Sequence, residues 1–147
     1  AVADYRPAVV ADKKIKRGEG GEMTISLVPN PDIAAELGAM KGKGQMLAGF
    51  ALETDDEQAN AEKKLRKKNL DFIVLNSLRN DGTCFRSDMN QISILSYDAG
   101  RLTRTDYTKK PKSEVAADIA DRLALGLSAA NVEEQQPQEH QGKVEGL

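Results

Sequence analysis

The sequence predicts an α/β fold with a Rossmann-like, mostly parallel sheet, helices packed on it and a β-hairpin arm. The apolar run Met46–Leu52 is followed by a charged stretch typical of a helix and then by a second apolar run, Leu70–Leu75. The first run is bounded by Gly42 and Gly44 before it and by a helix start after it, as expected for a buried strand, and the second is too continuous for a strand that keeps one face in water. Two buried strands joined by one helix are expected to be parallel, with a right-handed crossover.

Charged residues indicate where the connecting helix begins and ends. Thr54 and Glu57 in the sequence T-D-D-E are spaced as a capping box at the start of a helix. Acidic residues gather at this positive end of the helix dipole, whereas five basic residues lie between Lys63 and Lys68 at the negative end. Asn69 is predicted to close the helix.

Composition limits the classes of protein and partner. A chain of 147 residues fits one domain, and 39% hydrophobic residues supply only a modest core. The net charge of -2 gives no reason to expect nucleic acid or an anionic membrane as a partner. The single cysteine excludes an internal disulfide and suits a reducing compartment. Without a signal peptide or an apolar run of about 20 residues, a cytoplasmic protein is expected.

The first 28 residues predict a strand end followed by an arm. Asp4 lies where a strand ends, the place at which open α/β sheets bind ligands, although an aspartate before Arg6-Pro7 is also a common turn former. Residues 12–28 are expected to form a hairpin with glycines at its tip and with Lys14 and Lys16 on one face. Such an arm has little apolar cover, so it can close over an anion or simply stay solvated.

The next predicted helix begins at Asn30-Pro31, with Asn30 as N-cap and Pro31 in the first helical position. Its apolar face consists of Ile33, Leu37 and Met40. The glycine-containing linker that follows, residues 38–44, lacks the G-K-[ST] signature of a phosphate loop.

The last third predicts a hairpin and a covering helix. Residues 91–97 and 101–107 flank a loop of three residues, Asp98 to Gly100. A helix from Lys112 is expected to cover the sheet with Val115, Ile119 and Leu123. The domain is expected over residues 1–130, and the polar residues 131–147 are expected to be disordered. Cys84 is a poor candidate nucleophile because the only histidine, His140, lies in this tail.

Seven motifs together resemble one enzyme family. They are AVADYRP (1–7), KIKR (14–17), NPDI (30–33), GFALET (49–54), A-x-K-K-x-x-x-K-N-L-D (61–71), IVLNSL (73–78) and F-x-S-D-M-N (85–90). In this order they resemble the carboxyl-terminal part of bacterial phosphopantothenate-cysteine ligase, the synthetase part of the bifunctional coenzyme A biosynthesis flavoprotein. Two departures, Cys84 in place of the usual glycine and the bulky Arg86, leave the geometry of that loop open.

The resemblance implies a reaction and a set of site residues. The carboxylate of 4'-phosphopantothenate would attack CTP to give an acyl-cytidylate and pyrophosphate, and the cysteine amine would then displace CMP, with Mg²⁺ bridging the phosphates. Lys14 would be the catalytic lysine, on a flap that closes over the intermediate. The nucleotide contacts implied by the family are Asp4, Lys14, Asn30, Pro31, Asp32, Ile33, Phe50, Lys64 and Lys68.

Several of these residues have alternative explanations. A phenylalanine in a central strand, such as Phe50, is ordinarily core, and the helix dipole alone explains cations at Lys64 and Lys68. These two lysines also lie near the helix C-terminus, opposite the usual ligand crevice, so a site that uses them must extend around the sheet edge.

The resemblance also implies partners and leaves alternatives. A homodimer with contacts between the arms is expected, and FMN would serve only the decarboxylase half of the bifunctional protein. The phosphate loop and the phosphopantothenate motif of the family lie upstream of Ala1, so the chain alone is expected to be inactive or active only with that half. The alternatives are a non-catalytic nucleotide-binding or oligomerisation module and, with no supporting residue set, a flavin-dependent decarboxylase. The sequence does not decide between CTP and ATP.

Overall fold

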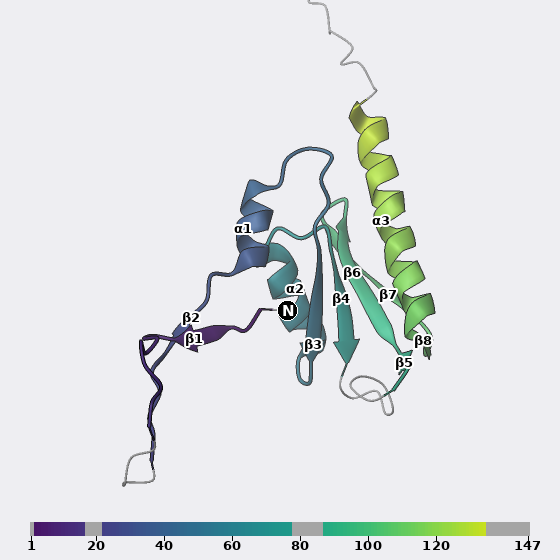
Figure 1. Cartoon of the computed structure of the whole chain (residues 1–147). Coiled ribbons are helices and arrows are strands. Elements are labelled where there is room, and N and C mark those ends of the chain that lie inside the picture. The colour runs from purple at the N-terminus through teal and green to yellow at the C-terminus, as the bar shows by residue number, and fades with distance from the viewer. Residues whose placement is uncertain (1, 17–21, 78–86, 135–147) are drawn as a thin grey trace, which may run out of the picture. The chain divides into compact units, whose positions relative to one another are not determined.

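The structure, a computed structural model, describes residues 2–16, 22–77 and 87–134 (Figure 1). The chain divides into two compact units, Ala1–Ile33 and Ala34–Leu147, which are described separately.

The first unit contains a two-stranded antiparallel ladder. β1 (Tyr5–Pro7) pairs with β2 (Leu27–Pro29), with Tyr5 opposite Pro29. The predicted hairpin at residues 12–28 is therefore wrong in position, because the residues described between β1 and β2 contain no strand. Their alternating apolar side chains find no core, and Ile15, Met23 and Ile25 are all more than half exposed. The predicted tip at residues 18–21 lies outside the described residues.

The second unit is built on a four-stranded sheet in the order β3-β4-β6-β7. Its strands are β3 (Ala48–Glu53), β4 (Phe72–Ser77), β6 (Ile92–Asp98) and β7 (Arg101–Asp106). β3 and β4 are parallel, as predicted, whereas β4 with β6 and β6 with β7 are antiparallel. The α/β class is thus confirmed, but the prediction of a mostly parallel sheet is wrong. A parallel pair needs a long crossover, usually helical, and the described residues provide one only between β3 and β4.

The hairpin of β6 and β7 is tighter than predicted. Asp98 pairs with Arg101, so the loop consists of Ala99 and Gly100 alone. Both residues have positive φ, 46° and 78°, as in a type I′ turn, whose twist matches that of the two strands. A second short ladder, β5 (Met89–Asn90) with β8 (Lys110–Pro111), precedes the last helix.

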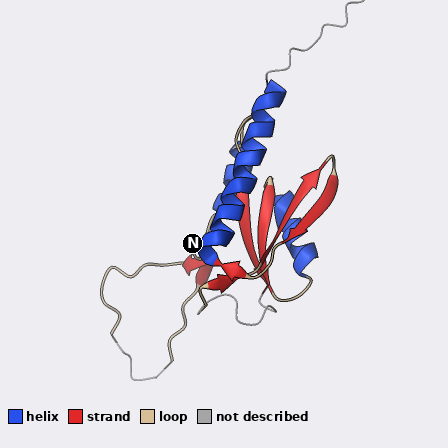
Figure 2. Ribbon diagram, turned by 90° about the vertical axis from the view of Figure 1, so that its right-hand side faces the viewer, coloured by secondary structure: helices blue, strands red, loops and turns tan. Residues whose placement is uncertain are grey.

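Helices cover both faces of the sheet (Figures 1 and 2). α2 (Glu57–Lys67) packs Ala61 and Leu65 on one face, and α3 (Lys112–Glu134) packs Val115 on the other. Along β4, Ile73 and Leu75 contact the α2 core, whereas Phe72 and Val74 contact the α3 core. This two-sided burial explains the continuous apolar run of β4.

The C-terminal helix matches its prediction in its packing. Ile119 and Leu123 pack against the α3 core together with Val115, as expected. The helix continues through Glu134, which lies inside the segment predicted to be disordered. Residues 135–147, including His140, lie outside the described residues. In the part of the chain that the structure describes, no helix is long and apolar enough to span a membrane.

The helix starts differ from the predictions. α1 (Ile33–Met40) begins later than the predicted cap at Asn30. α2 begins at Glu57 after Asp56, which has a left-handed φ of 43° and makes no side-chain cap hydrogen bond, so the predicted Thr54 capping box is wrong. Instead of reaching back to Thr54, the Glu57 carboxylate accepts a hydrogen bond from the Ser77 hydroxyl of β4.

The predicted end of α2 at Asn69 is confirmed. Asn69 adopts a left-handed φ of 49°. Its backbone N–H donates to the carbonyl of Arg66, and the N–H of Leu70 donates to the carbonyl of Leu65. These two bonds form a Schellman motif, in which asparagine tolerates the left-handed conformation better than most residues do.

Candidate nucleotide-binding site

The predicted nucleotide contacts are divided between the two compact units. Asp4, Lys14 and the N-P-D-I sequence belong to the first unit, whereas Phe50, Lys64 and Lys68 belong to the second.

In the first unit, hydrogen bonds of Asn30 stabilise the β1–β2 ladder. Its side-chain amide donates to the Ala3 carbonyl at 2.6 Å, its side-chain oxygen accepts from Arg6 at 3.0 Å, and its backbone N–H donates to the Asp4 carbonyl at 2.8 Å. These bonds hold Asp4 beside the start of the N-P-D-I sequence. The Asn30 side chain, predicted to cap a helix, instead joins two segments of the chain.

Lys14 lies on the exposed arm between β1 and β2, in a segment without regular strand pairing. An exposed ammonium on such a segment is accessible to an anion.

In the second unit, Phe50 is not a core residue. It lies on β3, one of the two edge strands of the sheet, and 72% of its surface is exposed. The alternative explanation of Phe50 as ordinary core is therefore wrong. Its neighbour Ala51 is buried against α2, and side chains alternate along a strand, so the Phe50 ring lies on the opposite face.

Lys64 lies on the flank of α2 that faces the same edge strand. Its ammonium contacts the Glu53 carboxylate at 2.6 Å, and Glu53 is largely buried while Lys64 is 44% exposed. Lys68, one helical turn later, is the C-cap residue of α2 and is half-buried. Phe50 and Lys64 therefore flank β3 on opposite faces of the sheet. A ligand that touches both must pass around the edge of β3. The position of Lys64 near the C-terminus of the helix predicts the same path.

The cations of α2 do not all belong to this flank. Arg66 lies on the other side of the helix, where its guanidinium donates to the Tyr97 hydroxyl and to Glu62 and lies 4.5 Å from the centre of the Tyr97 ring. Arg66 thus serves the packing of α2 on β6, whereas Lys64 contacts Glu53 of β3.

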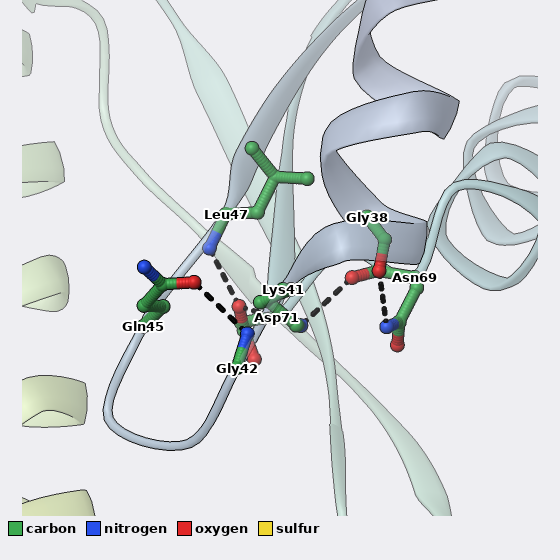
Figure 3. Close-up of polar contacts among 7 residues, drawn as sticks. All are labelled: Gly38, Lys41, Gly42, Gln45, Leu47, Asn69 and Asp71. Carbon is green, nitrogen blue, oxygen red and sulfur yellow. Dashed lines mark hydrogen bonds and ion pairs between the residues drawn. The ribbon is translucent and has the colours of Figure 1, made fainter.

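A polar junction that the sequence analysis did not single out lies where α1 and α2 end (Figure 3). It consists of Gly38, Lys41, Leu47, Asn69 and Asp71. The Lys41 ammonium donates to the Asn69 carbonyl at 2.8 Å and to the Asp71 carboxylate at 2.9 Å. The Asn69 amide donates to the Gly38 carbonyl at 2.8 Å, and Asp71 accepts from the Leu47 N–H at 2.6 Å. The signal in the sequence that could have indicated this junction is Asp71, a charged residue directly before the apolar strand β4.

A polar hollow of about 290 Å³ lies at the carboxyl end of β4, and its residues were also not predicted. Its lining is Glu57, Leu75, Ser77, Gln91, Ser93, Arg104 and Asp106. The Ser93 hydroxyl and the Arg104 guanidinium donate to Asp106 and hold the pKa of that carboxyl below its usual value. With two carboxylates and one guanidinium the lining is net negative, so a triphosphate is disfavoured there.

The described residues contain no group of three or more His, Cys, Asp or Glu side chains that could hold a metal ion.

Comparison with known proteins identifies the family of this chain. Residues 1–126 match the family model described as DNA/pantothenate metabolism flavoprotein C-terminal domain. The chain belongs to this family. The predicted resemblance is thereby confirmed: the chain corresponds to part of the phosphopantothenoylcysteine synthetase domain of CoaBC proteins.

Two curated relatives illustrate the family. A protein named cysteine/cysteine sulfinic acid decarboxylase, from an unknown prokaryotic organism, is 54% identical over 123 residues, which cover 84% of this chain and 33% of the relative. The coenzyme A biosynthesis bifunctional protein CoaBC of Bacillus subtilis is 41% identical over 122 residues, which cover 80% of this chain and 30% of the relative. The chain thus spans about a third of each relative.

Solved structures support the fold. The C-terminal domain of a CoaBC protein superposes with a TM-score of 0.65 at 32% identity, covering 88% of this chain and 52% of that one. A Cab2 variant solved in complex with phosphopantothenate-cysteine gives a TM-score of 0.64 at 16% identity, covering 92% of this chain and 44% of that one. The second likeness concerns the fold alone.

Proposed function

We propose that this domain supplies the nucleotide-binding half of a CTP-dependent phosphopantothenate-cysteine ligase of coenzyme A biosynthesis. The observation that carries the proposal is the family match over residues 1–126, which includes every predicted nucleotide contact. The placement of Phe50 and Lys64 on either side of the edge strand β3 supports it further, because neither side chain is buried in the core.

Each proposed role follows from the position of the side chain. The exposed Phe50 ring can stack on the base, and such stacking contributes about 1–3 kcal/mol. Lys64 and Lys68 bind phosphate. To do so, the Lys64 ammonium leaves its ion pair with the Glu53 carboxylate and contacts a phosphate oxygen. The N-P-D-I sequence, which Asn30 holds beside Asp4, leads into the start of α1, and the positive end of a helix dipole is a favourable position for an anion.

Lys14 has the proposed catalytic role. When the pantothenate carboxylate attacks the α-phosphate, negative charge accumulates in the transition state, and a mobile ammonium on the arm neutralises it. Mg²⁺, carried by the triphosphate, supplies further charge neutralisation when bound.

The substrates and the assembly complete the proposal. CTP, 4'-phosphopantothenate and cysteine are the reactants, and the Cab2 structure with phosphopantothenate-cysteine provides the corresponding product in a protein of the same fold. We further propose a cytoplasmic homodimer. FMN belongs to the decarboxylase half of the bifunctional relatives.

A non-catalytic oligomerisation module is the second candidate. The arm of the first unit favours it, because Val9 and Val10 are 82% and 85% exposed, which is costly for apolar side chains that never meet a partner.

Release of pyrophosphate from CTP and 4'-phosphopantothenate separates the two candidates. We would assay this chain with the upstream half of the ligase domain of the Bacillus subtilis relative, and titrate CTP, ATP and GTP into the chain by calorimetry. The ligase proposal expects pyrophosphate release and a preference for CTP. In the Lys14→Gln variant it expects a greater loss of turnover than of CTP affinity. Absence of pyrophosphate release and of nucleotide binding would favour the module.

A further inference from the structure

Two helix C-termini meet at the polar junction. α1 ends at Met40 and α2 at Lys67. Gly38 touches the end of α2 so closely that a Cβ at this position would lie 1.9 Å from the Lys68 carbonyl oxygen. The two helices therefore meet backbone to backbone, with their partially negative ends side by side.

The side chains of the junction offset the repulsion between the two partially negative helix ends. The Lys41 side chain is only 13% exposed, and its ammonium donates to the Asn69 carbonyl and to Asp71. The Asn69 amide satisfies the Gly38 carbonyl, one of the last carbonyl groups of α1. One cation and one amide thus hold both helix ends together.

Asp71 extends the junction to the sheet. Its carboxylate accepts from the Leu47 N–H at 2.6 Å, and its own N–H donates to the Leu47 carbonyl at 2.9 Å. Because Leu47 precedes β3 and Asp71 precedes β4, the Lys41–Asp71 ion pair connects α1 to the base of the parallel strand pair.

Apolar packing contributes little to holding α1. Its three large apolar side chains, Ile33, Leu37 and Met40, are 49%, 49% and 78% exposed. The only buried residue of α1 is Gly38, at the junction itself. The position of α1 relative to α2 is therefore set by polar contacts at one end of the helix.

We infer that Lys41, Asn69 and Asp71 are positioning residues for the nucleotide: within the second unit they fix α1 relative to Lys64 and Lys68 on α2. This inference rests on the proposed function, which assigns nucleotide contacts to both places. The junction acts through geometry, since its own polar groups bond to one another. Loosening it should weaken nucleotide binding and leave the chemical step nearly unchanged.

The experiment compares Lys41→Met with the charge-retaining Lys41→Arg, and Asn69→Ala with Asn69→Gly. Glycine preserves the left-handed backbone at position 69 and removes only the amide. Spin labels at exposed positions, introduced as Glu36→Cys on α1 and Lys63→Cys on α2 in a Cys84→Ser background, report the distance between the helices without nucleotide. Calorimetry on each unlabelled variant gives its Kd for CTP, and circular dichroism checks folding.

For Lys41→Met we expect a broadened label distance and a Kd for CTP raised about tenfold, the effect of losing a charge-assisted bond. The kcat of the assembled enzyme should stay within about twofold, and Lys41→Arg should restore part of the affinity. Asn69→Gly should broaden the distance although the cap survives, and Asn69→Ala should do so further.

Two results would overturn the inference, and they are distinguishable from failure of the proposed function. A label distance that stays narrow in both Lys41→Met and Asn69→Gly would show that other contacts hold α1. A broadened distance with unchanged CTP affinity would show a purely structural junction. If the unaltered chain binds no CTP, the proposed function fails and the nucleotide role of the junction fails with it.

Discussion

α1 and α3 have similar apolar spacing in the sequence and entirely different attachments in the structure. Val115, Ile119 and Leu123 of α3 pack on the sheet core, whereas Leu37 and Met40 of α1 remain exposed and the helix is held by the polar junction. A helical apolar pattern therefore indicates which face can pack, and does not show that it does. What distinguishes the two is the presence of a facing core: Phe72, Val74, Ile92 and Ile94 for α3.

The largest effect is expected where α3 meets the sheet. Phe72→Ala removes a fully buried ring and should lower the free energy of unfolding by about 3–5 kcal/mol. Urea denaturation followed by circular dichroism measures this change. The matched control on the same helix–sheet layer is Leu125→Ala, which is 67% exposed and should change stability by less than about 0.5 kcal/mol. Equal effects would contradict the two-sided core.

A smaller effect is expected where α1 meets α2. In Gly38→Ala the new Cβ would collide with the Lys68 carbonyl, so a backbone must shift at a cost of about 1–3 kcal/mol. Gly42→Ala is the control, because its Cβ would lie 3.7 Å from the nearest atom, the Gln45 side-chain oxygen. Urea denaturation gives the midpoint of each variant. If the two midpoints coincide, the helices do not meet at Gly38.

Phe50→Ala tests whether an exposed aromatic ring serves a ligand. Because the ring is 72% exposed, the free energy of unfolding should change by less than about 0.5 kcal/mol. Affinity for CTP should fall about tenfold if the ring stacks on the base. Calorimetry and urea denaturation on the same preparation measure both; a large loss of stability with unchanged affinity would assign Phe50 to packing.

The smallest effect concerns pH. The bonds from Ser93 and Arg104 lower the pKa of Asp106 in the folded state, so its contribution is fully present above the unfolded pKa of about 3.9 and is lost as the pH falls through the lower folded value. Asp106→Asn should therefore be less stable than the parent at pH 7, by less than about 1 kcal/mol at this exposed position. The difference should begin to shrink as the pH falls below about 4 and should disappear only below the lower folded pKa. A difference that is constant with pH would exclude the charge as its origin.

The sequence predicted the features that local pattern determines. The parallel pair of β3 and β4, the closing role of Asn69 and the packing face of α3 follow from apolar runs and cap chemistry. The antiparallel addition of β6 to β4 could not be predicted from two apolar runs, since strand direction depends on the connection between them.

The site was predicted less completely, for a physical reason. The motifs named individual residues, whereas the junction of Lys41, Asn69 and Asp71 arises from contacts across about 30 positions of the chain. Glu57 shows the same limit, because its local pattern favoured a capping box and Ser77 of β4 offered it a tertiary partner instead.

The measurement that most directly tests the central proposal is a titration of CTP followed through the backbone amide resonances of the chain. We predict shifts that cluster at the start of α1, at Phe50 and at Lys64 and Lys68, with smaller changes around Asp4 and Lys14. Shifts confined to the hollow around Ser77 and Arg104, or no shifts at millimolar CTP, would contradict a nucleotide site along the edge strand β3.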